Sequence, residues 1–324
     1  MLGRYINEKM DPTLNTFISK LTRIDNAGYS DNAMKIIYGQ TYKIINKCDL
    51  LVGNLESCIT NRMDREKKAF NFRIHPKYSR ALKIHKNMFL NVANNHIMDY
   101  QIEGMYDTLN DLDKLDIKYS GAGKNIQEAI KPVIMDIGGI KIGIIGCADH
   151  YDYWGATNNK PGIYYVDYNN YGHILNHIKE TKRNVDILIM SIHWGWNFIK
   201  GIDNKYQKFA RDVFDAGVNI IHGQSSHHVK CIRYNNTHMV MYGIGDFVND
   251  YTVNDAYRSN LGVIVKVSTD GKSIQRVSIH PTEVDDGKVT ILPPGKERDY
   301  ICDIVKDDCD IQPMDASYLS PECT

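Results

Sequence analysis

Short runs of apolar residues alternate with amphipathic stretches along this chain, and that alternation predicts an α/β fold. Several runs are apolar without interruption, which is typical of strands that are buried on both faces of a sheet. The expected strands cover residues 49–52, 88–92, 133–137, 140–145, 186–192, 218–221, 239–242 and 261–267. The expected helices cover residues 33–47, 76–85, 101–115, 171–182 and 204–216.

Glycines mark two of the expected boundaries. Gly138 and Gly139 separate two apolar segments, so this stretch predicts a β-hairpin with a two-residue turn. Gly217 directly follows an expected helix, and a glycine in the left-handed conformation commonly ends a helix. After residue 261 we expect mostly strands, and from residue 298 onward one short helix and a loose end.

Polar residues directly follow two of the expected strands, at the strand ends where ligands bind in open α/β sheets. Asn54 and Glu56 lie two positions apart, so extended backbone points both side chains, with their potential metal-binding oxygens, to one side. Asn95 and His96 follow the next strand, and Asp99 is placed to orient the imidazole of His96. The alternative is structural, because Asn-rich segments also form turns and cap helices.

Histidines follow two further strands. His193 ends one of them, although a lone histidine there is often a core residue bonded to the backbone. The other strand, at residues 218–221, leads into a loop rich in potential ligands, namely His222, Gln224, His227 and His228. Neutral imidazole is the commonest metal ligand in proteins. Because all four strand-end loops are rich in His, Asn or Glu, together they predict a metal site.

Composition narrows the classes of protein to consider. The chain has 39 basic and 39 acidic residues and therefore lacks the basic footprint of a nucleic-acid binder. The charged group at residues 65–68 mixes both signs and predicts a solvated loop. No stretch approaches the ~20 apolar residues of a membrane span, and the first residues do not form a signal peptide. As written, the chain predicts a cytoplasmic protein, unless an upstream signal or anchor precedes it.

The cysteines and the aromatic residues each support one further prediction, about the state of the thiols and about a loop. The seven cysteines are odd in number and none has CxxC spacing, so we expect reduced thiols rather than a disulfide framework or a structural zinc site. The stretch from Cys147 to His173 is aromatic-rich, with Tyr151, Tyr153, Trp154, Tyr164 and Tyr165. These rings either form a lid over the site or cover the sheet.

The strand-end segments resemble, in order and spacing, the signature blocks of the capsule-synthesis CapA-type family, which is associated with poly-γ-glutamate. That family belongs to the calcineurin-like metallophosphoesterase superfamily. The matching segments are residues 53–56, 93–99, 121–123, 193–195, 222–228 and 242–247. The resemblance implies a metallophosphatase-like, four-layer α/β/β/α sandwich of two mixed sheets over residues 1–295, followed by a C-terminal extension at 296–324. It also implies a site for one or two divalent ions, Mn, Fe or Zn.

The resemblance also implies a role for individual residues. The implied metal ligands are Glu56, Asn54, Asn95, His193 and His227. His96 would protonate the leaving group, with Asp99 orienting its ring, and its pKa near neutrality suits that role. Asp246 would support a ligand from behind. Possible replacement ligands are Gln224, His228 and His222.

Two departures from the family pattern affect the expected site. The family opens with a strand ending in Gly-Asp, whose Asp is the first ligand, and this chain as written begins just after that place. Asp11 lies too far downstream to replace it, so either the true start lies upstream or the first strand is missing. Gln224 stands where the family has a histidine, and glutamine binds borderline metals more weakly. We therefore expect weak or single-metal occupancy.

Three functions follow as hypotheses. The first is a metal-dependent hydrolase of capsule or polyanionic polymer biosynthesis that acts on a phosphoester or a related anionic bond. The second is a catalytically degenerate subunit that binds or assembles an anionic polymer. The third is a metal-dependent γ-glutamyl amide hydrolase, since metal-activated water attacks amides as well as phosphates. The substrate would be an anionic polymer or phosphoester, and the oligomeric state stays open.

Overall fold

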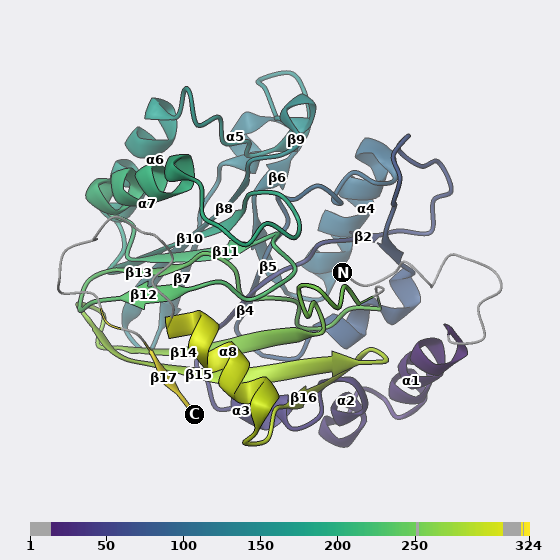
Figure 1. Ribbon diagram of the computed structural model, residues 1–324. Coiled ribbons are helices and arrows are strands. Elements are labelled where there is room, and N and C mark those ends of the chain that lie inside the picture. Colours follow the sequence, from purple (N-terminus) through teal and green to yellow (C-terminus); the bar gives the residue numbers. More distant parts are fainter. Residues whose placement is uncertain (1–13, 251–252, 307–318, 320) are drawn as a thin grey trace.

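The computed structural model describes residues 14–250, 253–306, 319 and 321–324, and it confirms the α/β fold (Figure 1). Asp11 lies outside the described residues. Four layers stack in the order helices, sheet, sheets, helices. All eight expected strands are present, with ends shifted by up to three residues.

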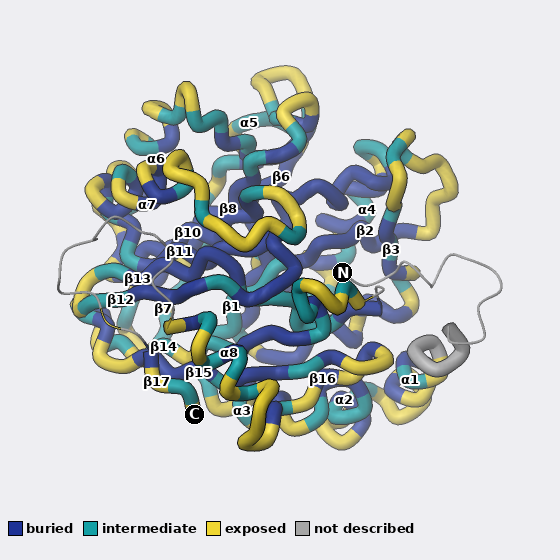
Figure 2. Tube along the Cα trace, viewed as in Figure 1, coloured by how far each residue is buried: buried dark blue, intermediate teal, exposed yellow. Residues whose placement is uncertain are grey.

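A six-stranded mixed sheet forms the second layer, in the order β12-β13-β11-β10-β8-β7. Its strands are β7 (Val133–Ile137), β8 (Ile140–Ala148), β10 (Ile187–His193), β11 (Ile220–Gln224), β12 (Ile232–Tyr234) and β13 (Met239–Met241). The four central strands run parallel, and both edge strands are antiparallel to their neighbours. Every residue of β10 and β11 is buried, as their uninterrupted apolar character predicts (Figure 2).

The predicted hairpin joins β7 to β8. Gly138 and Gly139 both have positive φ, +64° and +87°, as a primed two-residue turn requires. Asp136 also accepts a hydrogen bond from the backbone nitrogen of Gly139, at 2.8 Å. The hairpin therefore places β8 beside β10, and β8 delivers its carboxyl end to the same edge of the sheet as His193.

The third layer consists of two smaller sheets that pack against the first. One is parallel and contains β1 (Leu51–Asn54), β4 (Met88–Asn91) and β5 (Lys118–Ser120). The other carries the predicted β-rich finish and contains β14 (Leu261–Thr269), β15 (Ile274–Asp285), β16 (Lys288–Ile291) and β17 (Glu322–Cys323). Apolar side chains of both layers meet in one cluster, which includes Phe89, Ile144, Ile189 and Val263. Two short pairs complete the strands, β2 (Cys58–Ile59) with β3 (Arg73–Ile74) and β6 (Ala122–Gly123) with β9 (Gly162–Ile163).

Helices cover both outer faces. On the six-stranded sheet lie α5 (Ile126–Ala129), α6 (Gly172–Lys182) and α7 (Asn204–Ala216). Asp203 caps α7 by accepting a hydrogen bond from the backbone nitrogen of Lys205, and Gly217, at φ +121°, ends it. On the other face lie α1 (Leu14–Asn26), α2 (Asp31–Tyr38), α3 (Thr41–Ile45), α4 (Gln101–Lys114) and the 3₁₀ helix η1 (Pro76–Leu82). A 3₁₀ turn, η2 (Asp152–Trp154), and the helix α8 (Lys296–Lys306) complete the described elements. Among the described helices, none has the length and apolar character of a membrane span.

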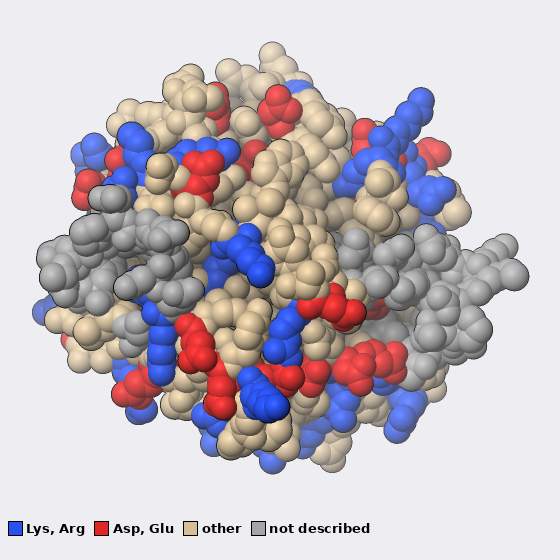
Figure 3. All heavy atoms as spheres, viewed as in Figure 1, with Lys and Arg blue, Asp and Glu red and all other residues tan. Residues whose placement is uncertain are grey.

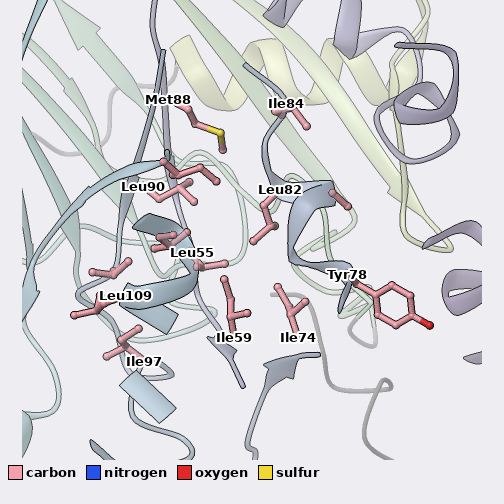
Figure 4. Packing of buried hydrophobic residues seen from close by; sticks show 14 of the residues in the cluster. Leu55, Ile59, Ile74, Tyr78, Leu82, Ile84, Met88, Leu90, Ile97 and Leu109 are labelled. Carbon is pink, nitrogen blue, oxygen red and sulfur yellow. The ribbon is translucent and has the colours of Figure 1, made fainter. Parts of the chain in front are cut away.

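Buried apolar side chains under α4 and η1 anchor the loops that follow β1 and β4. Figure 4 shows Leu55 and Ile97 within this cluster, together with Ile59 and Leu90. Leu55 precedes Glu56 and Ile97 follows His96, so each polar candidate is flanked by a residue fixed in the core. The loops are therefore held in place by packing.

Charged side chains of both signs are interspersed on the surface. On the face drawn in Figure 3, Lys and Arg side chains lie among Asp and Glu side chains, and no large area of a single sign stands out. This mixture is what equal numbers of basic and acidic residues, 39 of each, predict. The described part of this face therefore offers no continuous basic surface of the kind that binds nucleic acids.

Two helices differ from the sequence-based prediction. The helix expected at 33–47 is divided into α2 and α3 at Gly39, whose φ is +49°. A side chain at this position would collide with the carbonyl oxygen of Val289, so β16 packs directly on the break. The helix expected at 76–85 is 3₁₀ rather than α, and it begins with Pro76.

The prediction of reduced thiols throughout the chain is wrong. Cys302 on α8 and Cys323 on β17 form a disulfide with a Cα–Cα distance of 5.8 Å, and Cys231 is also disulfide-bonded. The spacing of cysteines along the sequence could not predict the bond between Cys302 and Cys323. The two residues come together only because β17 pairs with β15. Free thiols are present at Cys48, Cys58 and Cys147. Ile301 and Val305 of α8 join the apolar cluster between the sheets, so the C-terminal helix packs on the same core.

Candidate metal centre

The loops that follow four strands converge at the carboxyl edges of the two central sheets. Asn54 ends β1 and pairs in register with Asn91 of β4, so Glu56 and the 94–99 loop emerge side by side. His193 ends β10 and pairs with Gln224, the last residue of β11. The strand-end pattern of the sequence therefore corresponds to one region of the folded chain.

Three imidazoles surround the carboxylate of Glu56. Its Oε1 lies 3.9 Å from Nε2 of His96, 3.8 Å from Nε2 of His193 and 3.7 Å from Nε2 of His227. All four side chains are buried, with exposed fractions between 0% and 7%. The structure thus brings together the predicted acid, two predicted imidazole ligands and the predicted acidic ligand.

Several buried polar atoms at this place have no hydrogen-bond partner among the described residues. They are Asn54 Oδ1, Glu56 Oε1, Asn95 Oδ1, His193 Nε2 and His227 Nε2. Leaving a buried polar atom unpaired costs about 1–3 kcal/mol, so five such atoms in one region are unfavourable unless a ligand satisfies them. All five are lone-pair donors of the kinds that bind divalent cations.

The spacing of these atoms is wide, but it is compatible with a shared ion. Within the described ranges, no group of three or more His, Cys, Asp and Glu side chains is already arranged to hold a metal. Two ligands that each lie ~2.1 Å from one cation can be at most about 4.2 Å apart. The distances of 3.7–3.8 Å from Glu56 to His193 and His227 meet that limit. These two distances are therefore compatible with pairs of ligands that share one cation.

His96 is fixed from behind by a buried ion pair. Its Nδ1 lies 2.7 Å from Oδ2 of Asp99, as the sequence predicts, and Oδ1 of Asp99 lies 2.5 Å from Nζ of Lys68. Lys68 also donates to the backbone oxygen of Asn95. The prediction of a solvated loop at residues 65–68 is therefore wrong for Lys68, whose side chain is 13% exposed. Its role depends on tertiary contacts that local sequence does not reveal.

Burial and nearby charges both shift the pKa values of His96 and Asp99. Burial lowers the pKa of His96 well below its ordinary value, and the nearby charge of Lys68 lowers it further. Burial raises the pKa of Asp99 to about 7, against the opposing effect of Lys68. These two effects outweigh the opposing charge of Glu56, so His96 is neutral at neutral pH.

His227 has the opposite electrostatic environment. Its Nδ1 lies 2.9 Å from Oδ1 of Asp246, whose other oxygen accepts a hydrogen bond from Asn249 at 2.7 Å. Burial alone would lower the pKa of His227, but the charges of Asp246 and Glu56 outweigh it and raise the pKa. Burial would raise the pKa of Asp246, yet His227 lowers it to about 2. Asp246 thus stands behind His227, where the resemblance places it, and directs Nε2 toward Glu56.

The three possible replacement ligands are engaged in different ways. The amide nitrogen of Gln224 donates to Ser191 Oγ at 3.0 Å and to the backbone oxygen of His222 at 2.6 Å. Nδ1 of His222 lies 2.9 Å from Ser191 Oγ, and burial lowers the pKa of His222 to about 4. Nδ1 of His228 lies 2.7 Å from the backbone oxygen of Ser226, while its buried Nε2 has no partner among the described residues.

Sequence reasoning missed one pair of polar side chains next to the centre. Asp149 and His150 directly follow β8, and Nδ1 of His150 contacts Oδ1 of Asp149. The ring of His150 lies 5.3 Å from that of His193, between centroids. The same signal that identified the other loops, polar residues directly after a buried strand, would have identified this pair if β8 had been extended to Ala148.

The aromatic loop mostly covers the sheets, as one of the two interpretations expects. Trp154 and Tyr164 are buried in the two helix-facing clusters. Tyr151 and Trp154 lie over Lys68, with ring centroids 5.6 and 5.1 Å from its Nζ. Tyr153 is 53% exposed and stacks on Tyr151. The loop therefore packs on the partly buried ammonium of Lys68 behind His96.

Solved structures that align with this chain have little sequence in common with it. A hypothetical protein from Thermus thermophilus aligns with a TM-score of 0.49 and 9% identity, covering 81% of this chain and 95% of its own. A 5'-nucleotidase precursor from the same organism aligns with a TM-score of 0.37 and 15% identity, covering 68% and 41%.

Several curated proteins are more similar to this chain in sequence than these solved structures are. A probable polyglutamine synthesis accessory protein of Mycobacterium tuberculosis is 29% identical over 244 residues, which cover 71% of this chain and 64% of the relative. The PGA biosynthesis protein CapA of Bacillus subtilis is 29% identical over 218 residues, covering 66% and 57%. The capsule biosynthesis protein CapA of Bacillus anthracis is 25% identical over 212 residues, covering 64% and 52%. The chain thus spans between half and two thirds of the length of these relatives.

The sequence model of one family matches most of the chain. This family is described as bacterial capsule synthesis protein PGA_cap, and the match extends over residues 2–251. That range contains Glu56, His96, His193, His227 and Asp246. The chain therefore belongs to the bacterial capsule synthesis protein family PGA_cap.

Proposed function

We propose that this chain is a metal-dependent hydrolase of capsule or polyanionic polymer biosynthesis, acting on a phosphoester or a related anionic bond. One observation carries the proposal: three imidazole Nε2 atoms lie 3.7–3.9 Å from Glu56 Oε1. That oxygen and two of the three nitrogens are buried and have no partner among the described residues. The names of the relatives, PGA and capsule biosynthesis proteins, supply the biological setting.

The proposed division of labour follows from the contacts. Glu56, His193 and His227 would hold the cation, with Asn54 and Asn95 as further oxygen donors. When bound, a divalent cation supplies a Lewis acid and a water that ionises near neutral pH. Asp246 holds His227 by its Nδ1, which leaves the Nε2 lone pair free for the ion.

His96 would act as the general acid that protonates the leaving group. Asp99 accepts from its Nδ1, so Nε2 faces Glu56 and the space in front of it. Because burial and Lys68 keep the pKa of His96 low, the imidazole needs the negative charge of an anionic substrate before it can hold a second proton. This requirement favours phosphoesters over neutral amides as substrates, because a phosphoester brings that charge itself.

The test measures metal content and turnover separately. Metal per chain is determined by mass spectrometry on protein purified without chelators, and phosphomonoesters and phosphodiesters are then screened. We expect Glu56→Gln to lose bound metal, and His96→Asn to keep the metal but lose turnover. Glu103→Gln, an exposed carboxylate on α4, is the matched control and should change neither. Wild-type protein that binds no Mn, Fe or Zn would refute the proposal.

One observation favours a second candidate function, a degenerate subunit that binds or assembles the polymer. Gln224 stands where the family has a histidine, and its amide is engaged by Ser191 and His222. This candidate predicts metal binding without turnover of any ester. Substitution of Gln224→His would then be expected to raise metal affinity, which calorimetric titration of the ion measures.

A further inference from the structure

A cavity of about 400 Å³ lies next to the proposed metal centre. Its lining includes Asp149, His150, Asp167, Trp196, Lys205 and Tyr206. His150 lines the cavity, and its ring lies 5.3 Å from the ring of His193. The volume is at the small end of the ~300–1,000 Å³ range of small-molecule sites, which suits a single ring-sized unit.

An exposed indole forms one wall. Trp196 is 64% exposed, and one face of its ring stacks on His150 at 5.5 Å with an 18° angle between planes. The neighbouring Gly195 donates a backbone hydrogen bond to Oδ2 of Asp149 at 2.8 Å, which fixes the start of the loop. The indole is therefore held against His150 and remains largely exposed beside the cavity, where a ring can stack on it.

A lysine is held in place opposite the acidic residues. Nζ of Lys205 lies 4.9 Å from the ring centroid of Tyr206 and 5.4 Å from that of Tyr168, within the range of cation–π contacts. The hydroxyl of Tyr168 donates to Oδ2 of Asp149 at 3.2 Å. The side chains of Lys205 and Asp149 are thus held in place by contacts within the protein itself.

The charges of the lining decide against an anionic occupant. Two carboxylates, Asp149 and Asp167, outnumber the single ammonium of Lys205 in this cavity. A phosphate or carboxylate would be repelled more than attracted. A neutral ring that carries hydroxyl groups meets no such penalty, since hydroxyls donate to carboxylates and accept from an ammonium. The C–H faces of a pyranose also pack against an aromatic ring.

We propose that this cavity binds one uncharged pyranose unit of a carbohydrate, stacked on Trp196 and bonded at its edge by Asp167 and Lys205. The position beside His193 makes the sugar a neighbour of the bond to be cleaved, and this part of the inference rests on the proposed function. Binding of the sugar itself requires neither metal nor turnover. The substrate would then be a sugar-containing phosphoester.

The experiment measures sugar binding directly by ligand-observed NMR and calorimetry. The probes are methyl α-glucopyranoside and methyl N-acetyl-β-glucosaminide, with sorbitol as an open-chain polyol that offers the same hydroxyls without a ring. We expect a Kd of about 1 mM for at least one pyranoside, typical of a ligand of this size, and binding at least tenfold weaker for sorbitol. Trp196→Ala should weaken pyranoside binding at least tenfold. Tyr153→Ala, an exposed aromatic outside the cavity, should leave it unchanged.

Several outcomes would overturn the proposed sugar site or reassign the cavity. Equal binding of sorbitol and both pyranosides, or unchanged binding in Trp196→Ala, overturns the proposal. Tighter binding of phenol than of either pyranoside would assign the cavity to a planar aromatic group instead. Because metal-free protein serves equally well, sugar binding without metal uptake would refute only the proposed hydrolase. Metal uptake and ester turnover without sugar binding would refute only this inference.

Discussion

Nζ of Lys68 lies 2.5 Å from Oδ1 of Asp99 and 3.2 Å from Nδ1 of His96, beneath the rings of Tyr151 and Trp154. This partly buried cation connects the loop after β4 to the aromatic loop after β8. It compensates the carboxylate that orients His96 and at the same time opposes protonation of that imidazole. One side chain therefore affects both the position and the charge of the proposed acid.

Substitution of Lys68→Met should destabilise the protein by about 3 kcal/mol, because it leaves the carboxylate of Asp99 buried without its cation. Urea unfolding measures the change. Lys67→Met is the matched control, since the neighbouring side chain is exposed and should shift the free energy of unfolding by less than about 0.5 kcal/mol. Equal effects of both substitutions would show that the ion pair contributes nothing specific.

Substitution of Asp246→Asn should weaken metal binding about 10–100-fold while the fold stays intact. The carboxylate accepts from Nδ1 of His227 and raises the basicity of Nε2, so an amide in its place would support the ligand less well. Isothermal titration of Mn or Zn measures the affinity. Asp255→Asn, on an exposed turn after the same loop, should bind as the wild type does. Unchanged affinity in Asp246→Asn would exclude His227 as a ligand.

Stability should fall in acid partly because of His177. Burial lowers the pKa of His177 in the folded state below the ~6.5 of the unfolded chain. Between these two values the unfolded state binds more protons, so stability decreases as the pH falls below about 6.5 and levels off below the folded-state pKa.

The test compares urea unfolding of wild type and His177→Gln at several pH values from about 5 to 8. Glutamine can keep the contact with the hydroxyl of Tyr164, which lies 3.3 Å from Nδ1, and it does not titrate. We expect a shallower pH dependence in this variant. His173→Gln, exposed on the first turn of α6, should keep the wild-type slope. A wild-type slope in His177→Gln as well would remove this residue from the explanation.

Removal of the disulfide between Cys302 and Cys323 should destabilise the protein by about 3 kcal/mol. The two residues are 21 positions apart, and closing a loop of that size restricts the unfolded chain to about this extent. The double variant Cys302→Ser with Cys323→Ser tests this by urea unfolding. Cys48→Ser, at a free and partly buried thiol, is the control. A midpoint equal to that of wild type would argue against the pairing.

Periodicity and strand ends predict the central architecture because they depend on local sequence. The hairpin at Gly138 and Gly139 follows from turn chemistry that positive φ satisfies, and mostly apolar strands flank it on either side. The loops containing Glu56 and His96 are identifiable because polar side chains directly after buried strands need a partner. Their proximity to His193 and His227 follows from parallel strands ending at one edge.

Other features depend on contacts between distant segments. Lys68 lies in a mixed-charge run that predicts a surface, yet Asp99 holds it in the interior. Gly39 interrupts a helix because Val289 of β16, far away in the chain, packs against it. The cavity beside His150 requires β8 and β10 to end together, so no single segment of sequence contains it.

The bond between α8 and β17 has a practical consequence for producing this protein. Cys302 and Cys323 come together only when β17 is paired with β15. Their bond therefore fixes the C-terminal segment against the sheet. A host whose folding compartment keeps thiols reduced would release chains without that closure. Such chains would retain the central sheets and carry a C-terminal segment more accessible to proteases. Secretion into an oxidising compartment should therefore give a more homogeneous preparation than expression in a reducing one.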